Sequence, residues 1–467
     1  MDRTLFDKLW TAHHIKTLDS GESLIAIDRV FLHERTGSVA LKSIVERGRM
    51  PHDPKSVFCT IDHIVSNIDG RGQDDARMPG GQAFIKATRK AAKATGINLI
   101  DVLDENQGIV HVISPELGIA QPGLTLVCPD SHTCSQGALG ALAWGIGSTD
   151  AEHAIVTGTL RLRKPPQMRI KISGQLGEGV TAKDVALYLI AKYSADGARR
   201  CAVEYTGSVI DEMSIEERLT LCNMAVEFAA FTAVIAPDAT TYAYLKSRKF
   251  TPKDSDWEQA LQDWQRLKTD PNAHFDYDYE IDAADINPTV TWGTSPAHAV
   301  SIEGNVPIEA EAKVLDYMGL MGGEPLSSLS IGGAFIGSCT NARLSDLQEA
   351  AAILKGKRVF DGINAICVPG SMAVRRAAEA EGLDIIFKQA GFVWGSPGCA
   401  FCFYAGGETF APYTRVISST NRNFEGRQGP DVRTHLASPA VVAASAIAGH
   451  ICSPKSRSIW NGPVQSA

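Results

Sequence analysis

Two short cysteine-containing segments constrain this chain more than any other feature of its sequence. The first is residues 337–341, which read Gly-Ser-Cys-Thr-Asn, and the second is residues 398–402, which read Gly-Cys-Ala-Phe-Cys. Together they offer three thiols in apolar, glycine-containing surroundings, where the backbone can approach a ligand closely. Thiolates are the soft ligands that select zinc, copper(I) or iron–sulfur clusters. The segments therefore predict a bound metal or cluster.

The number of thiols helps to choose among these ligands. A structural zinc site normally has four protein ligands, and no fourth Cys or His lies near either segment. Three thiolates on a cubane of iron and sulfide would leave one iron to act as a Lewis acid on a substrate oxygen. A redox pair or a zinc half-site also has a Cys-x-x-Cys, but redox motifs usually expose a polar thiol. Cys402 lies between Phe401 and Phe403, which favours a buried cofactor.

Composition bounds the class of protein. A chain of 467 residues is too long for one core and should hold two to four domains. Its net charge of −8 offers no basic field for nucleic acid or an anionic membrane. Ten mostly isolated cysteines do not indicate a disulfide framework and favour a reducing compartment. The acidic first residues do not resemble a signal peptide, and the apolar residues 439–450 are too few to span a bilayer. We expect a cytoplasmic protein.

Short apolar runs alternate with helical patterns along the chain, which predicts an α/β architecture with a mostly parallel sheet. Consecutive prolines in residues 163–167 and the Gly-Asn-Val-Pro of residues 304–307 suggest boundaries between domains. We therefore expect three α/β portions, at residues 1–165, 166–305 and 306–467.

Four histidines lie at the ends of apolar runs in the first third of the chain. They are His33, His63, His111 and His132. Asp62 directly precedes His63, and Asp130 lies two residues before His132. Residues just past the carboxyl ends of parallel strands line the ligand crevice of open α/β sheets. Each histidine alone would also fit a buried structural role, but four together predict a ligand site.

Three further stretches have two interpretations each. Asn223 and Glu227 would share one face of a helix, as a pair in a site or as surface residues. Arg422 and Arg427 could offer planar forks to carboxylates or lie in a solvated loop. The glycine-rich residues 137–147 lack a full dinucleotide fingerprint, so we expect tight helix packing there.

Taken together, these motifs resemble the aconitase superfamily and, within it, the large subunits of the isopropylmalate isomerases (3-isopropylmalate dehydratases). The similar motifs occur in family order at residues 61–63, 111–112, 130–133, 222–224, 337–341, 397–402 and 421–428. The resemblance covers about residues 5 to 452. It implies a three-domain aconitase-like α/β core around a central [4Fe–4S] cluster, without the superfamily's swivelling fourth domain.

The resemblance also implies roles for individual residues. The cluster ligands would be Cys339, Cys399 and Cys402. The catalytic residues would be three histidine–carboxylate pairs, namely His63 with Asp62, His111 with Glu227, and His132 with Asp130. The substrate-binding residues would be Ser131, Asn223, Asn421, Arg422 and Arg427.

The implied activity is that of a hydro-lyase acting on a hydroxy diacid. Dehydration would give a cis-alkene diacid, and rehydration at the other carbon would complete an isomerisation. The best single expectation is conversion of 2-isopropylmalate to 3-isopropylmalate in leucine biosynthesis. A separate small subunit would supply the swivelling domain with its serine base, so this chain alone should be nearly inactive. No nucleic-acid or membrane partner is expected.

Three departures from the isomerase pattern leave the substrate open. Residues 33–38 read His-Glu-Arg-Thr-Gly-Ser in place of His-Glu-Val-Thr-Ser-Pro, and Ser135-Gln136 replaces Thr-His. Residues 403–409 replace a segment containing Met-Asn-Pro. Arg35 could meet a further carboxylate or lie on the surface. Citraconate, dimethylmaleate and homoaconitate-type substrates are the alternatives within this class.

Two other classes of protein also compete with the hydro-lyase interpretation. One is a cluster-free RNA-binding protein, against which the acidic charge balance argues. The other is a zinc-stabilised scaffold, which would contain zinc without sulfide.

Overall fold

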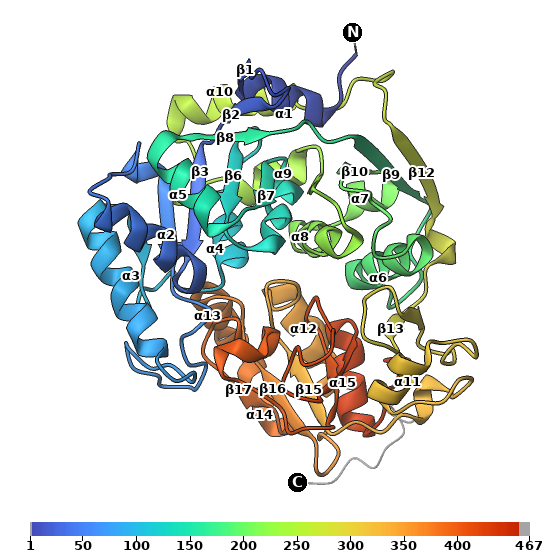
Figure 1. The fold of residues 1–467 in the computed structure, drawn as a ribbon. Coiled ribbons are helices and arrows are strands. Elements are labelled where there is room, and N and C mark those ends of the chain that lie inside the picture. Colours follow the sequence, from blue (N-terminus) through green and yellow to red (C-terminus); the bar gives the residue numbers. More distant parts are fainter. Residues whose placement is uncertain (1, 457–467) are drawn as a thin grey trace. The chain divides into compact units, whose positions relative to one another are not determined.

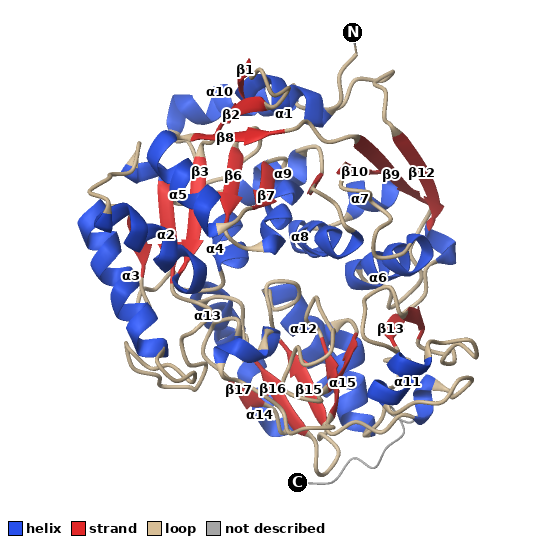
Figure 2. Ribbon diagram, in the orientation of Figure 1, coloured by secondary structure: helices blue, strands red, loops and turns tan. Residues whose placement is uncertain are grey.

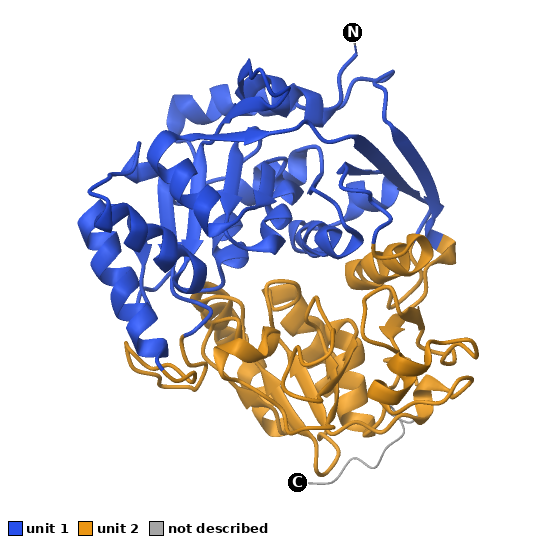
Figure 3. Ribbon diagram, in the orientation of Figure 1, with its two compact units in different colours: residues 1–64, 80–175, 196–283 blue, residues 65–79, 176–195, 284–467 orange. Residues whose placement is uncertain are grey.

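The computed structural model describes residues 2–456. Residue 1 and residues 457–467, which the first and third expected portions include, lie outside the described residues. The chain divides into two compact units (Figure 3). Unit 1 comprises residues 1–64, 80–175 and 196–283, and unit 2 comprises residues 65–79, 176–195 and 284–467. The division into three portions stays a prediction.

A five-stranded parallel sheet forms the centre of the first part of unit 1 (Figures 1 and 2). Its strands, in spatial order, are β5 (Asn98–Ile100), β4 (Val57–Thr60), β3 (Arg29–His33), β6 (Thr125–Cys128) and β7 (Leu142–Gly145). The helices of this part include α1 (Leu5–His13), α2 (Glu34–Glu46), α3 (Gly81–Thr95), α4 (Val110–Glu116) and α5 (Ser148–Thr157). Helices α1, α2, α3 and α5 bury their apolar residues with those of the sheet in one core. The alternation of strands and helices predicted here is confirmed.

Unit 1 contains two smaller sheets. A four-stranded parallel sheet has the order β11 (Thr232–Val234), β10 (Ala202–Thr206), β9 (Gln167–Ser173) and β12 (Tyr277–Asp282). An antiparallel sheet joins β1 (His14–Thr17), β2 (Ser23–Ala26) and β8 (Thr159–Leu162). The remaining helices are α7 (Ser208–Glu212), α8 (Ile215–Met224), α9 (Ala239–Leu245) and α10 (Asp254–Gln265). Two 3₁₀ segments, η2 (Ser131–Leu139) and η3 (Ala225–Phe228), carry residues discussed below.

Unit 2 is built on a second five-stranded parallel sheet. Its strands, in spatial order, are β17 (Val393–Trp394), β16 (Asn364–Cys367), β15 (Gly333–Ile336), β18 (Arg415–Ser418) and β19 (Arg433–Leu436). Alternate residues of a strand point to opposite faces. Accordingly Ala334 and Ile336 join a large core, whereas Phe335 between them joins a small core with Phe401 and Phe410. Both faces of the sheet are therefore covered.

The helices of unit 2 complete the large core. They are α11 (Ala312–Met318), α12 (Leu344–Leu354), α13 (Met372–Ala380), α14 (Leu383–Ala390) and α15 (Pro439–Ala448). Helix α6 (Ala182–Tyr193) also belongs to unit 2 and packs against the hairpin of β13 (Thr289–Thr291) and β14 (Ala299–Ser301). A capping box formed by Thr181 and Asp184 begins α6.

The structure differs from the sequence predictions at three places. The apolar run around His111 is helix α4, not a strand, so this histidine does not follow a strand end. Helix α8 ends at Met224 and tightens into η3, so Glu227 is not on one α-helical face with Asn223. The glycine-rich stretch, for which tight helix packing was expected, packs closely against a strand. A Cβ on Gly137 would lie 1.7 Å from the carbonyl oxygen of Ala233 in β11.

Among the helices of residues 2–456, none combines the length and the apolar character that a membrane crossing requires.

Candidate active site

The carboxyl ends of three strands in unit 1 bring polar side chains to one edge of the sheet. His33 is the last residue of β3, Asp62 and His63 follow β4, and Asp130 follows β6. Because β3 lies between β4 and β6 and all three are parallel, these ends lie at the same edge. The sequence prediction of a polar site at these ends is consistent with this arrangement.

Asp62 and His63 form a hydrogen-bonded pair. The Nδ1 of His63 donates to Oδ1 of Asp62 at 2.6 Å, and the backbone N–H of Val110 donates to Oδ2 of Asp62 at 2.8 Å. Burial acts to raise the pKa of Asp62, but the charge of His63 and its hydrogen bond outweigh burial and lower this pKa. The carboxylate therefore stays ionised and fixes the orientation and tautomer of His63.

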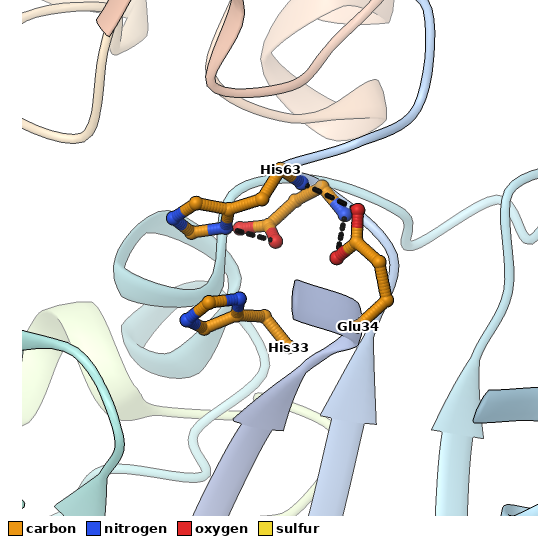
Figure 4. A group of neighbouring side chains, drawn as sticks. His33, Glu34 and His63 are labelled. Carbon is orange, nitrogen blue, oxygen red and sulfur yellow. Dashed lines mark hydrogen bonds and ion pairs between the residues drawn. The ribbon is translucent and has the colours of Figure 1, made fainter. Parts of the chain in front are cut away.

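Glu34 fixes the backbone that carries this pair (Figure 4). Its carboxylate accepts hydrogen bonds from the backbone N–H groups of Asp62 (3.1 Å), His63 (2.8 Å) and Ile64. Glu34 is fully buried, and burial together with the charge of Asp62 raises its pKa to about 7. Three consecutive amides on one carboxylate leave the segment after β4 little freedom.

His33 stacks on His63, with ring centroids 3.8 Å apart and an interplanar angle of 17°. The Thr36 hydroxyl donates to the carbonyl oxygen of Pro129 at 3.0 Å, so Nε2–H of His33 donates to Thr36 at 3.0 Å. Nδ1 of His33 is then a buried acceptor without a partner among the described residues. Burial and the charge of His63 lower the pKa of His33 to about 3, so this ring is neutral.

His33, Glu34, Asp62 and His63 are close enough to suggest a metal site, with one ligand atom from each within 4.8 Å of the others. Their existing hydrogen bonds argue against that role. Both oxygens of Glu34 already accept backbone N–H groups, and both oxygens of Asp62 accept from His63 and Val110. A metal ion would have to displace these contacts. We therefore interpret the group as a hydrogen-bonded cluster.

Asp130 is the carboxylate around which three histidines gather. Its Oδ1 accepts from Nε2 of His111 at 2.9 Å and from the backbone N–H of His132 at 2.8 Å. Its Oδ2 lies 3.6 Å from Nε2 of His63. Burial acts to raise the pKa of Asp130, but the histidines, His111 first, hold it well below its ordinary value. This one half-buried anion thus orients several rings.

The pairing of histidines with carboxylates differs from the expected one. His111 pairs with Asp130, whereas Nε2 of His132 donates to Oε1 of Glu227 at 2.8 Å. The expected pair of His132 with Asp130 is also present, with Nδ1 of His132 3.6 Å from Oδ1 of Asp130, whereas His111 contacts Asp130 in place of Glu227. Glu227 reaches His132 because the chain tightens into η3 after α8.

Two expected substrate-binding residues lie in the same unit. The side-chain amide of Asn223, fully buried, donates to Oγ of Ser135 at 2.9 Å, and Ser135 donates to the carbonyl oxygen of His132 at 2.6 Å. Ser131 is the half-buried first residue of η2, next to His132. Ser135, one of the departures from the isomerase pattern, therefore contacts the residues expected to form the site. Arg35 is half-buried in the first turn of α2, directly after Glu34.

The three thiols of unit 2 also follow the carboxyl ends of parallel strands. Cys339 follows β15, and Cys399 and Cys402 follow β17. All three are buried, and none of the ten cysteines, all of which are described, forms a disulfide. Cys399 and Cys402 lie in one 3₁₀ turn, in which the N–H of Cys402 donates to the carbonyl oxygen of Cys399 at 2.9 Å. Phe401 anchors this turn, with its ring centroid 4.6 Å from that of Phe410.

One amide connects two of the thiols. Nδ2 of Asn421, which follows β18, lies 3.5 Å from Sγ of Cys339, and Oδ1 of Asn421 lies 3.9 Å from Sγ of Cys402. The hydroxyl of Ser338 also donates to Sγ of Cys402 at 3.3 Å. We call Cys339, Cys399, Cys402 and Asn421 the thiol group.

Two residues next to cysteines of the thiol group have left-handed backbone angles. Ser338, directly before Cys339, has φ 80°, and Ala400, directly after Cys399, has φ 46°. Such angles cost a residue with a Cβ about 1 to 3 kcal/mol, and they concentrate at functional sites. These strained positions are consistent with a ligand at the thiols.

Arg427 lies beside the thiol group. Its Nη2 is 3.5 Å from Sγ of Cys402, and its guanidinium lies over the rings of Phe403 and Phe424 at 5.9 and 5.3 Å. Its Nε has no partner among the described residues. Tyr404 supports it through a backbone N–H that donates to the carbonyl oxygen of Arg427 at 2.8 Å. Arg422 is half-buried and directly follows Asn421.

The donor set of the thiol group fits an iron–sulfur cluster. It contributes three buried thiols of one chemical kind, and an amide and a hydroxyl point donors at the sulfurs. Hydrogen bonds to sulfur tune such clusters. The expected ligands Cys339, Cys399 and Cys402 would hold the cluster.

Sequence reasoning did not find every residue that shapes these groups. Glu34 has no role in the sequence prediction, because a glutamate at a helix start usually serves only the helix dipole. Ser338 is part of a recognised motif, but its hydrogen bond to a cysteine two strands away in the fold has no local signal.

Comparisons with known proteins agree with the motifs. A profile of the aconitase family (aconitate hydratase) matches residues 7–449. The 3-isopropylmalate dehydratase large subunit 1 of Bradyrhizobium diazoefficiens is 46% identical over 459 residues, which cover 96% of each chain. A solved structure, the holo-form of Thermococcus kodakaraensis aconitase X, covers 86% of this chain and 84% of its own at 13% identity and a TM-score of 0.45. That structural likeness is too weak to carry an argument.

Replacing Glu34 by Gln should destabilise unit 1. The amide would keep one oxygen acceptor and turn an N–H₂ group towards backbone N–H donors, leaving buried donors unsatisfied at about 1–3 kcal/mol. Thermal unfolding measures this change. Glu46→Gln, at an exposed position at the end of the same helix, is the matched control and should unfold like the unchanged protein. Equal melting temperatures for both variants would contradict the role of Glu34.

The unchanged protein and the Glu34→Gln variant together also test the raised pKa of Glu34. A carboxyl whose pKa is raised by folding stabilises the folded state fully at pH values below its ordinary pKa of 4.5. This contribution disappears as the pH rises through the folded-state pKa of about 7. The stability advantage of the unchanged protein over the Glu34→Gln variant should therefore shrink between pH 5 and pH 8.

Proposed function

Because the chain belongs to the aconitase family, we propose that it is the large subunit of an iron–sulfur hydro-lyase that isomerises 2-isopropylmalate to 3-isopropylmalate. The observation that carries the proposal is the 46% identity to a 3-isopropylmalate dehydratase large subunit over 96% of both chains. The buried thiol group supports the cofactor, which we propose to be a [4Fe–4S] cluster held by Cys339, Cys399 and Cys402. When bound, the cluster supplies Lewis acidity that weakens the carbon–oxygen bond of the substrate hydroxyl.

The residues of unit 1 would move protons. Dehydration removes a hydroxyl and a proton from neighbouring carbons as water, and hydroxide leaves poorly unless it is protonated. His63, held by Asp62, is proposed to protonate the leaving hydroxyl group and to take a proton back from water on rehydration. His111 and His132, held by Asp130 and Glu227, are proposed to assist at the same hydroxyl. The carboxylates keep each ring in one tautomer and stabilise its protonated form.

The residues after β18 would bind the substrate's carboxylates. Arg422 and Arg427 offer guanidinium forks, and Arg427 keeps an N–H donor without a protein partner among the described residues. Ser131, Asn223 and Asn421 are proposed to provide further hydrogen bonds to the diacid. A negative charge builds on the carboxylate next to the carbon that loses its proton, and the arginines would stabilise it.

The base that removes that proton is proposed to come from a separate small subunit, because the relative is itself named a large subunit. We also propose that the enzyme works in the cytoplasm, where its ten cysteines stay reduced.

A second candidate substrate class follows from the departures. Residues 403–409 include Tyr404, which supports Arg427, and Ser135 supports Asn223. These contacts place two departures next to residues proposed to bind the diacid. Citraconate, dimethylmaleate or a homoaconitate-type triacid is therefore the alternative within the same chemistry.

The test uses anaerobically reconstituted chain mixed with the small subunit of a 3-isopropylmalate dehydratase. The alkene absorbance of 2-isopropylmaleate, citraconate and cis-aconitate should fall on hydration. We expect 2-isopropylmaleate to react at least tenfold faster than the others. Faster hydration of another diacid would keep the chemistry and replace the substrate, and no hydration of any alkene would contradict the proposed function.

Replacing Cys399 by Ser should abolish both the visible absorbance of the reconstituted cluster and turnover, because one of three thiolate ligands is lost. Cys452→Ser changes another buried cysteine of unit 2 and is the control that should keep both. An intact cluster in the Cys399→Ser chain would remove Cys399 from the ligand set.

Replacing Arg427 by Lys should leave the cluster absorbance unchanged and lower kcat/KM roughly 10- to 100-fold, because Lys lacks the planar fork for a carboxylate. Arg358→Lys, at an exposed position in unit 2, is the control. Steady-state kinetics with increasing substrate separates weaker binding from slower chemistry. Unchanged kinetics in Arg427→Lys would exclude Arg427 from the site.

A further inference from the structure

Lys183, in the first turn of α6, has a fully buried side chain. Lysine is almost never fully buried unless it is paired, since moving an ammonium out of water is costly. Its neighbour Asp184 is also buried, but the Asp184 oxygens accept from Thr181 and from the backbone N–H of Thr289. The capping of α6 thus explains Asp184 but not Lys183.

The ammonium group of Lys183 reaches a different part of unit 2. Its Nζ donates to the backbone carbonyl oxygen of Ser419 at 3.0 Å and to that of Thr420. These two residues connect the end of β18 to Asn421. Lys183 therefore holds the backbone directly before the amide that contacts Cys339 and Cys402.

Ser419 extends this connection to the first cysteine. Its Oγ accepts from the backbone N–H of Gly337 at 3.0 Å and lies 3.1 Å from the carbonyl oxygen of Gly337 and 3.2 Å from that of Asn341. Gly337 and Asn341 lie on either side of Cys339 in the sequence. The segment that Lys183 holds is thus tied both to the Cys339 loop and, through Asn421, to two sulfurs.

We infer that Lys183 is a positioning residue for the thiol group, which sets the place of Asn421 and adds a buried positive charge to the loops that carry the thiolates. This inference rests on the proposed iron–sulfur site. A buried charge is weak evidence for stability, because an apolar residue of similar size often stabilises a core as well. A site that collects three thiolates, in contrast, gains from a fixed positive charge in its supporting loops.

The inference predicts a change in the cluster and not only in the fold. Lys183→Met keeps most of the side-chain volume and removes the charge and the donors. Lys192→Met, at an exposed position on the same helix, is the matched control. In reconstituted chains, Lys183→Met should lose iron to a chelator about tenfold faster than the unchanged chain and should show an altered electron paramagnetic resonance spectrum after reduction. Lys192→Met should match the unchanged chain in both measurements.

A double-mutant cycle tests whether Lys183 acts through Asn421. If it does, Lys183→Met should add little to the faster iron loss of Asn421→Ala, since residues in one network are not additive. Additive effects of the two changes would overturn that route. Equal iron loss and equal spectra for Lys183→Met and Lys192→Met would overturn the inference as a whole.

Two further measurements separate the possible failures. Circular dichroism of the cluster-free chains shows whether Lys183→Met folds. If it does not, Lys183→Gln, which keeps a neutral N–H donor, replaces it, and iron retention equal to that of the unchanged chain would exclude the role of charge. Absence of iron and sulfide in the unchanged reconstituted chain would contradict the proposed function itself, independently of Lys183.

Discussion

The arrangement of functional side chains depends first on the alignment of parallel strands. In each five-stranded sheet all strands run in one direction, so their carboxyl ends share one edge. In unit 1 this edge carries Asp62, His63 and Asp130, and in unit 2 it carries Cys339, Cys399 and Asn421. Residues that are far apart in the chain thereby become neighbours without long excursions of the loops. The backbone hydrogen bonding of the strands holds them there.

Within each group, polar contacts set the final geometry. In unit 1 the shared element is the ionised Asp130, which one histidine ring, one backbone amide and two further rings approach. This half-buried anion stays ionised because donor groups surround it on several sides. In unit 2 the shared element is a neutral amide that contacts two sulfurs. The two groups therefore differ in chemistry: histidines and carboxylates meet in one, and thiols and a neutral amide meet in the other.

The alternation of strands and helices could be predicted from the sequence, because strand periodicity and strand ends are local features. The roles of the site residues stay predictions. The apolar runs before His33, His63 and His132 are strands β3, β4 and β6. The contacts of His111 with Asp130 and of His132 with Glu227 were not predicted, since they depend on how η3 turns after α8. The role of Glu34 was missed for a similar reason. Its three hydrogen bonds reach a segment 28 to 30 residues away, and no local pattern encodes such contacts.

The left-handed conformation of Ser338 has a consequence for how this loop can vary. Glycine would adopt φ 80° without steric cost, whereas serine does so at a cost. Only serine, however, brings a hydroxyl to Sγ of Cys402. At this residue a relaxed backbone favours glycine, whereas the hydrogen bond to Sγ of Cys402 requires a hydroxyl. Replacing Ser338 by glycine would therefore relieve the backbone and, in the same step, remove the hydroxyl that contacts Cys402.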